Sequence, residues 1–206
     1  MSFKTKKYQV IKGALSKELA NFIFNYMMLQ RDAVDFMVKN QKINPYNPFI
    51  GNRVDQQIPG AYSKYADWVM ETLLMYMIPV MKAKTGLELI PTYSYTRLYE
   101  KGNILHRHKD RPSCEISTTL HLGGDEWPIF LQPSGEIGTE GIKVLLNPGD
   151  MLVYEGCKME HWREAFEGEN CAQVFLHYND ASGKFAEQNK YDKRPFLGLP
   201  AWFKNQ

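Results

Sequence analysis

The sequence predicts an α+β protein in which N-terminal helices buttress a double-stranded β-helix, the jelly-roll or cupin-like barrel. Between about residues 91 and 180, short β-like runs follow one another, with Gly and Pro between them at intervals of roughly ten residues. Before residue 90, apolar residues instead recur at helical spacing. The length and apolar content suit a single domain over residues 1–206, with helical support over about 1–90, a barrel core over about 91–180 and a packed tail over about 181–206.

The first predicted helix follows a short strand. Tyr8–Ile11 is the strand, Gly13 interrupts it, and Ser16 is placed to cap the helix. The apolar residues that recur at helical spacing are Leu19, Phe22, Ile23, Tyr26 and Met27. We expect this stripe to belong to the core and not to a cofactor site.

A loop and a second helix complete the N-terminal part. Pro, Gly and Asn are frequent from about residue 40 to 60, which predicts an irregular loop. Loops carried on a rigid scaffold often bind substrates, and packing or turn formation explains their side chains equally well. The candidate contacts are Tyr46, Phe49, Asn52 and Arg53. A helix is predicted from Tyr62 to about Lys84, with a kink at Pro79 and its end at Gly86.

The barrel part contains a series of short strands. They are predicted at Thr92–Tyr99, Glu115–Leu122, Pro128–Gln132, Ile142–Leu146, Met151–Tyr154, His161–Phe166 and Ala172–Tyr178. Four aromatic residues in or beside them are expected to fill the barrel or to pack it against the helices: Trp127, Phe130, Trp162 and Phe175. The tail is too apolar for free disorder, so it should pack back on the domain or on a second subunit.

Composition limits the compartment and the partners. A net charge of +2 with scattered Lys and Arg favours a solvated surface over a nucleic-acid face. Cys114, Cys157 and Cys171 show no paired spacing, which indicates a reducing compartment and no disulfide framework. Because no apolar stretch approaches the length of a signal or membrane segment, we expect a soluble cytoplasmic protein, monomeric or homodimeric, with no membrane partner.

Three residues have the pattern of an iron site. In an extended segment His108 and Asp110 project to the same side, so both can bind one metal ion. His161 follows the turn at 147–150 and a short buried strand, which can bring it back to them. Two imidazoles and a carboxylate hold Fe(II) on one face and leave the other open for a co-substrate and dioxygen. His106 and His108 also have ligand spacing, and that pair would favour a three-His cupin or zinc site.

These segments resemble the Fe(II)/2-oxoglutarate-dependent dioxygenases, and within them the prolyl 4-hydroxylase-like branch. The resemblance covers roughly Thr92 to Asp180 and rests on Tyr99–Gly102, His108–Asp110, Ser117–Leu122, Asn147–Asp150 and His161. It implies Fe(II) held by His108, Asp110 and His161, with 2-oxoglutarate and O2 as co-substrates and ascorbate as a reductant. It also implies hydroxylation of an unactivated C–H, of a prolyl residue in a peptide or of a free amino acid, with release of succinate and CO2.

The distal carboxylate of 2-oxoglutarate requires a cation or several donors inside the barrel. Where the family has Arg or Lys, this chain has Asn170, Cys171, Ala172 and Gln173. Arg163 is our preferred replacement, because on a continuing strand it faces the same interior as His161. Arg97 is the alternative, since it shares its strand face with Tyr93, Tyr95 and Tyr99. A surface ion pair with Glu100 or Glu164 would leave either arginine without this role.

Further residues are assigned to the same pocket. By position, the resemblance makes Tyr99 the co-substrate-facing tyrosine. Ser117, Thr119 and His121 alternate along the next strand and can add donors, although His121 could equally be a core residue. His177 is expected to be a buried or edge histidine.

Other functions stay open at this point. A nucleic-acid-modifying oxygenase is disfavoured by the weak clustering of basic residues. A cupin-like metal- or ligand-binding protein without turnover would have the same barrel, but the full triad is present. A zinc hydrolase would need a general base beside the metal, and the sequence has no His-Glu-x-x-His motif. The substrate is predicted only as a peptide or a small molecule.

Overall fold

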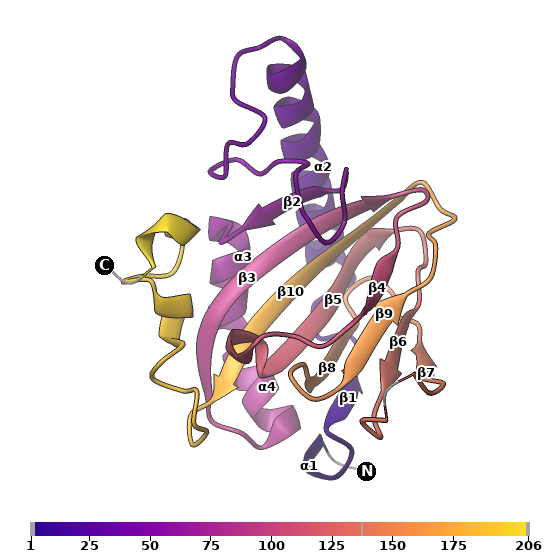
Figure 1. The fold of residues 1–206 in the computed structure, drawn as a ribbon, viewed down its shortest axis with the longest axis vertical. Helices are drawn as coiled ribbons and strands as arrows, with labels where there is room; N and C mark the ends of the chain where they lie inside the picture. Colours follow the sequence, from indigo (N-terminus) through magenta and orange to yellow (C-terminus); the bar gives the residue numbers. More distant parts are fainter. Residues whose placement is uncertain (1–2, 137, 205–206) are drawn as a thin grey trace.

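The computed structural model describes residues 3–136 and 138–204, in which two antiparallel sheets face each other (Figure 1). The strands are β1 (Tyr8–Ile11), β2 (Tyr62–Tyr65), β3 (Leu89–Glu100), β4 (Leu105–His108), β5 (Ile116–Gly124), β6 (Ile129–Gln132), β7 (Ile142–Val144), β8 (Met151–Glu155), β9 (Glu160–Arg163) and β10 (Asn170–Asp180). The larger sheet has the order β1-β8-β5-β10-β3-β2 and the smaller has β4-β9-β6-β7. This arrangement confirms the predicted double-stranded β-helix.

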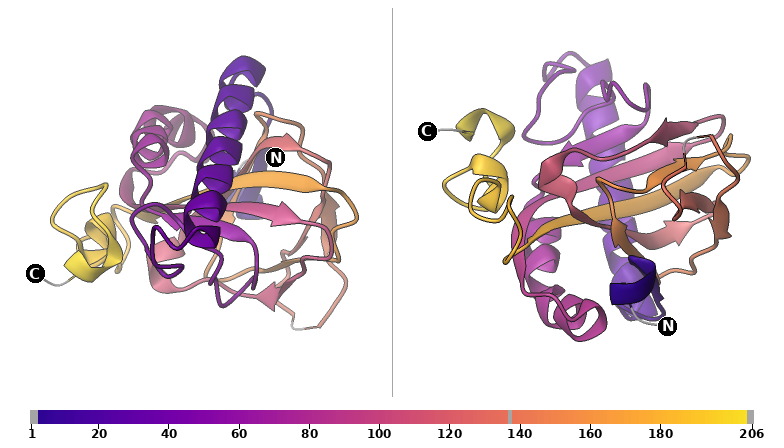
Figure 2. Two further views of the ribbon diagram at one scale, coloured as in Figure 1. Left: turned by 90° about the horizontal axis from the view of Figure 1, so that it is seen from above. Right: turned by 60° about the horizontal axis from the view of Figure 1, so that its bottom comes forward.

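Helices cover the outer face of the larger sheet (Figure 2). They are α2 (Lys17–Lys39), α3 (Trp68–Tyr76) and α4 (Ile78–Thr85), with a short α1 (Phe3–Lys6) beside α4. Their inner sides and the larger sheet enclose the main hydrophobic core, and two smaller apolar clusters lie around the two facing sheets. No helix in the described part of the chain is long and apolar enough to cross a membrane.

Helix α2 begins as predicted, but only Ile23, Met27 and the partly buried Tyr26 of the predicted stripe pack on the core. The Ser16 hydroxyl accepts a hydrogen bond from the Leu19 N–H at 3.2 Å, which caps the helix. The side chains packed inward are Ala20, Ile23, Met27 and Val34. Leu19 and Phe22 are 40% and 67% exposed, so their assignment to the core was wrong. The helix has apolar residues on two faces, and periodicity alone does not determine which one meets the sheet.

The predicted second helix was also wrong at its beginning. Residues 62–65 form β2 and pair with β3, with Tyr62 opposite Leu98. Asp67 then caps α3, because its carboxylate accepts hydrogen bonds from two N–H groups of the first turn. The helix breaks at Met77, and Pro79 lies in the first turn of α4, where proline is tolerated. Gly86, at φ 71°, ends α4 as predicted.

The four predicted core aromatics divide between two environments. Trp127 and Phe175 are buried, as expected. Phe130 and Trp162 instead stack on each other, with ring centroids 5.5 Å apart, and both are only partly buried. The guanidinium of Arg107 lies over the Trp162 ring at 3.6 Å. Since the neighbouring Leu131 and His161 point inward, alternation places this pair on the outer face of the smaller sheet.

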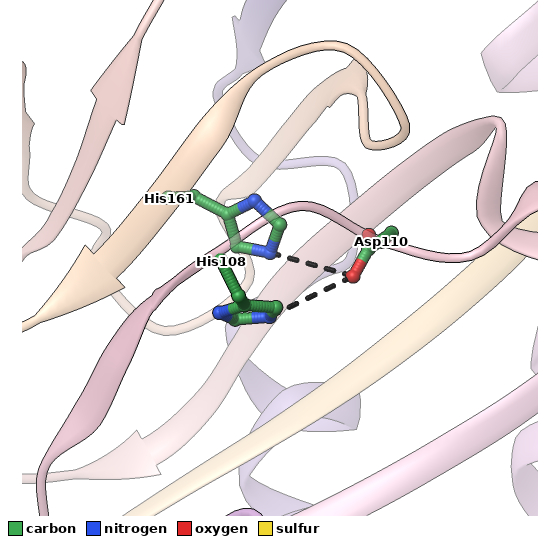
Figure 3. A group of neighbouring side chains, drawn as sticks. All are labelled: His108, Asp110 and His161. Atoms are coloured by element: carbon green, nitrogen blue, oxygen red, sulfur yellow. Dashed lines mark ion pairs between the residues drawn. The ribbon is translucent and has the colours of Figure 1, made fainter. Parts of the chain in front are cut away.

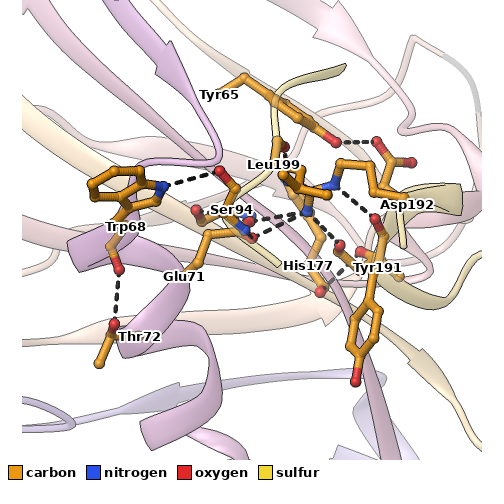
Figure 4. Close-up of polar contacts among 12 residues, drawn as sticks. Tyr65, Trp68, Glu71, Thr72, Ser94, His177, Tyr191, Asp192 and Leu199 are labelled. Atoms are coloured by element: carbon orange, nitrogen blue, oxygen red, sulfur yellow. Dashed lines mark hydrogen bonds and ion pairs between the residues drawn. The ribbon is translucent and has the colours of Figure 1, made fainter. Parts of the chain in front are cut away.

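The tail packs back on the domain, as one of its two predicted alternatives (Figure 4). Arg194 is buried and its Nη2 lies 3.1 Å from Glu71 Oε2 on α3. The Glu71 carboxylate also accepts hydrogen bonds from the Ser94 N–H and the Gly198 N–H. These contacts join the tail, α3 and β3 through one buried carboxylate.

We predict that Glu71→Gln lowers the free energy of unfolding by about 3–5 kcal/mol, because it leaves a buried guanidinium uncompensated. Urea denaturation of the full chain measures the change. The matched control is Lys82→Ala, which removes an exposed ion pair with Glu88 and should change stability by less than about 1 kcal/mol. Equal, small effects of both substitutions would contradict a structural role of the buried pair.

Candidate metal and co-substrate site

The fold brings the three predicted metal ligands together (Figure 3). His108 ends β4 and lies directly opposite His161 on β9. Asp110 follows β4, where its N–H donates to the Gly156 carbonyl at 2.9 Å. The Nε2 atoms of His108 and His161 lie 3.7 and 3.5 Å from Asp110 Oδ1. One atom from each residue can therefore reach a single ion, since these atoms lie within 4.8 Å of one another.

Hydrogen bonds with neighbouring groups orient the two histidine rings and the aspartate so that their metal-binding atoms face one another. The Nδ1 atoms of His108 and His161 lie 2.7 and 3.1 Å from the carbonyl oxygens of His106 and Met159. A carbonyl only accepts, so each Nδ1 carries the proton and each Nε2 presents its lone pair. Ser117 donates its hydroxyl to Asp110 Oδ2 at 2.6 Å, which leaves Oδ1 for a metal.

The protonation states also suit a metal. Burial alone would raise the pKa of Asp110, but the adjacent His161 ring and the Ser117 hydroxyl hold that pKa well below its ordinary value. Burial and the adjacent His161 lower the pKa of His108. At neutral pH the cluster therefore offers a carboxylate and a neutral His108 imidazole, the forms that bind metal.

Two competing ligand sets are disfavoured. His106 is exposed, and only its backbone carbonyl takes part in the cluster, so the structure does not support the three-His alternative. Asp110, Cys114 and His177 form a second group with ligand spacing. Burial raises the pKa of the Cys114 thiol well above its ordinary value, which makes it a poor ligand. His177 is buried, as expected, with its Nδ1 3.1 Å from the Ser117 hydroxyl.

A second polar cluster lies deeper in the barrel. Arg163, only 1% exposed, has its Nη2 3.3 Å from the Thr119 hydroxyl, and its Nη1 donates to the Trp127 carbonyl. The Thr119 hydroxyl donates to Gln173 Oε1 at 3.0 Å, and Gln173 Nε2 lies 3.0 Å from His121 Nδ1. Arg163 thus faces the interior, as the alternation from His161 predicts. Gln173 is one of the four residues at 170–173 that, by the resemblance found in the sequence, stand where a cation is expected.

Several atoms of this cluster have no hydrogen-bond partner. Within residues 3–136 and 138–204, Arg163 Nε, the Tyr99 hydroxyl and His121 Nε2 are buried without one. In the same residues, Arg163 forms no ion pair with a carboxylate. A buried guanidinium that lacks a carboxylate partner is costly, and a bound carboxylate would neutralise its charge. The residues present therefore fit the distal carboxylate of 2-oxoglutarate.

The alternative anchor, Arg97, already has a carboxylate partner. Its Nε lies 2.8 Å from Asp55 Oδ2, and its Nη2 donates to Gln57 Oε1 at 2.6 Å. Tyr95 donates to the same aspartate at 2.6 Å. These contacts of Arg97 with Asp55 and Gln57, which we call the clamp, hold the loop after α2 against the barrel. Because Arg97 already binds a carboxylate, it is less suited than Arg163 to bind a second one.

The clamp places Gln57 over the three candidate metal ligands. Gln57 Nε2 lies 2.9 Å from His108 Nε2, and both residues line a cavity of about 90 Å³ together with Asp110 and His161. The other lining residues are Tyr93, Tyr95, Arg97, Leu105, Ile129, Tyr154, Phe175 and His177. Sequence reasoning missed Gln57 and Asp55, because no local pattern marks a loop residue that reaches the site only in the folded chain.

The four substrate contacts predicted in the loop do not line this cavity. Arg53 instead binds Asp35 and Glu100, at 2.7 and 2.9 Å. Tyr46 and Phe49 are exposed, and the backbone of Asn52 pairs with Ser63. Arg53 and Asn52 hold the loop in place, whereas its part after residue 54 reaches the site.

Comparisons with known proteins support the fold at low sequence identity. No family model and no curated protein matches the chain. A prolyl-4-hydroxylase from Pseudomonas putida is 16% identical over 86% of this chain and 95% of its own, with a TM-score of 0.59. The carbocyclase SnoK from nogalamycin biosynthesis, described as non-heme and alpha-ketoglutarate dependent, is 13% identical over 96% and 90%, with a TM-score of 0.61.

A third solved structure holds both groups that the site suggests. HygX from Streptomyces hygroscopicus, with nickel and 2-oxoglutarate bound, is 13% identical over 87% of this chain and 85% of its own, with a TM-score of 0.57. The chain therefore has the fold of the Fe(II)/2-oxoglutarate oxygenases, including those that resemble prolyl 4-hydroxylase. The resemblance found in the sequence is confirmed at the level of the fold.

Proposed function

We propose that the protein is an Fe(II)- and 2-oxoglutarate-dependent oxygenase that hydroxylates a substrate C–H and releases succinate and CO2. One observation carries the proposal. His161, in the two-His, one-carboxylate cluster, and Arg163, the buried cation without a carboxylate, lie two residues apart on β9. A metal ligand and an anion-binding group are thus held on one rigid strand, as 2-oxoglutarate binding requires.

Each group has a separate task in this proposal. His108, Asp110 and His161 hold the iron, which with 2-oxoglutarate and O2 supplies the oxidation of an unactivated C–H. Arg163 binds the distal carboxylate, and the Tyr99 hydroxyl and His121 Nε2 supply further polar contacts. Ser117 keeps Asp110 oriented. The surrounding barrel excludes water from the reacting groups.

The polar side chains at the opening of the cavity favour a polar substrate. Gln57, Arg97 and Tyr95 line it, and Gln57 already places an amide beside the metal ligands. An amide or carboxylate group of a peptide or a free amino acid has matching hydrogen-bonding chemistry. We therefore propose a peptidyl residue or a small polar molecule as the substrate, with a prolyl residue as the first candidate, and ascorbate as the reductant that keeps iron ferrous.

Succinate formation tests this function. Protein with Fe(II), ascorbate and 2-oxoglutarate in air should release succinate slowly, and prolyl peptides or free amino acids should be screened for acceleration and for addition of one oxygen atom. Protein with Zn(II) in place of Fe(II) is the control and should release none. If the Fe(II)-loaded protein consumes no 2-oxoglutarate, either alone or with any of the substrates tested, the oxygenase assignment is wrong.

A further inference from the structure

Helix α2 carries a second apolar face that its own domain covers only at Tyr26, which is partly buried against the main core. The face consists of Leu19, Phe22, Tyr26, Leu29, Ala33 and Phe36, which we call the α2 seam. Their spacing alternates between three and four residues, the pattern of apolar residues at the contact of two paired helices. Phe22, Leu29 and Phe36 are 67%, 69% and 67% exposed.

The α2 seam and the buried stripe of α2 lie on different sides of the helix. Ala20, Ile23, Met27 and Val34 pack toward the larger sheet, and the left view of Figure 2 shows α2 lying in front of that sheet. The loop after α2 packs beside Val34 and Val38, which are also off the seam. The seam therefore remains accessible along α2, over about 26 Å from Leu19 to Phe36 at the rise of an α-helix.

We propose that the α2 seam is a homodimer interface in which two copies of α2 pack antiparallel about a two-fold axis. A two-fold interface uses the same patch on both subunits, so the patch must be complementary to its own reverse. The seam meets this condition, because reversing it keeps the alternating spacing of three and four. The facing pairs are then Leu19 with the partner's Phe36, Phe22 with the partner's Ala33, and Tyr26 with the partner's Leu29.

The charges at the two ends of the seam favour this orientation. Glu18 and Lys39 are both exposed, and they precede Leu19 and follow Phe36 on the same side of the helix. In an antiparallel pair Glu18 faces the partner's Lys39, twice by symmetry. A parallel pair would instead bring like charges together at both ends, which is unfavourable. The helix dipoles also oppose each other favourably in the antiparallel pair.

The composition around the seam favours a protein partner over a membrane surface. Helices that lie on membranes have Lys and Arg beside the apolar face. The polar residues beside this seam include Glu18, Asn21, Asn25 and Asp32. An anionic surface would gain little from them, whereas a second copy supplies the matching Lys39.

The available area is adequate for a dimer. Phe22, Leu29 and Phe36 together expose on the order of 400 Å². A standard interface buries about 800 Å² on each partner. The remaining seam residues and the flanking Glu18, Asn25, Asp32 and Lys39 can supply the rest. An exposed apolar area of this size matches the largest patch of a typical monomer, and such patches are often functional.

Sedimentation velocity of the full chain over a range of concentrations tests the proposal. The wild-type protein should sediment as a dimer. Leu29→Glu should raise the dimer Kd by about 30-fold or more, because it places charges at the centre of the contact. The matched control is Ala83→Glu, which adds the same charge to an exposed position of α4, away from the seam. It should leave the Kd unchanged, and circular dichroism should show both variants folded.

A charge exchange tests the orientation. Glu18→Lys should weaken the dimer a few-fold, and the double variant Glu18→Lys, Lys39→Glu should restore it, because each end again has opposite charges. In a parallel pair the single and the double variant would both resemble the wild type. A monomeric wild-type protein, or equal dimerisation of Leu29→Glu and the wild type, would overturn the proposal.

Discussion

Asp110→Ala is expected to abolish iron-dependent turnover of 2-oxoglutarate while the barrel stays folded. Asp110 supplies the only carboxylate of the cluster, with its Oδ1 directed toward the Nε2 atoms of both histidines. Loss even of a hydrogen-bond partner of a metal ligand weakens metal binding about 10- to 100-fold, so loss of the ligand should weaken Fe(II) binding by more than about 100-fold. Succinate release and Fe(II) titration measure the two effects.

His106→Ala is the matched control for this prediction. His106 is exposed and contributes only its backbone carbonyl, which the substitution preserves. Its Fe(II) affinity and succinate release should equal those of the wild type. Normal turnover by Asp110→Ala would contradict the assigned ligand set. Loss of iron binding in His106→Ala would restore the three-His alternative.

Arg163→Leu should raise the 2-oxoglutarate concentration needed for half-maximal succinate release by roughly 30-fold or more. Removing one partner of a buried charge-assisted pair costs about 2–5 kcal/mol of binding free energy, and the lower value corresponds to this factor. The variant without ligand should be at least as stable as the wild type, because the substitution removes a buried charge without a carboxylate partner in the described residues. Thermal unfolding measures that second effect.

Arg97→Leu is the comparison that separates the two candidate anchors. Its guanidinium binds Asp55 and Gln57, so the substitution should loosen the loop over the metal ligands. The requirement for 2-oxoglutarate should stay near that of the wild type. An unchanged requirement in Arg163→Leu, together with a large rise in Arg97→Leu, would transfer the anchoring role to Arg97.

Strand alternation made much of the site predictable from the sequence. It placed His108 and Asp110 together and put Arg163 on the interior side of His161, because side chains two residues apart share a face. The turn predicted at 147–150 is also present, and Gly149 adopts φ 88° there just before β8. These features depend on short stretches of chain, which local rules describe well.

The errors arose where distant contacts decide the structure. Residues 62–65 are a strand because β3 offers a pairing edge, although helical spacing also fits them. Phe22 lies on one of two apolar faces of α2, and only the position of the sheet determines which face is buried. Gln57 reaches His108 because Arg97 and Asp55 hold its loop, a contact between segments far apart in the sequence.

The most direct test of the central claim is an anaerobic absorption titration of the Fe(II)-loaded protein with 2-oxoglutarate. The central claim is that the two-His, one-carboxylate cluster and Arg163 form one binding site. The titration should produce a weak visible metal-to-ligand charge-transfer band that saturates, and the Arg163→Leu protein should need far more 2-oxoglutarate to produce it. Fe(II) binding without any such band in the wild-type protein would contradict the claim.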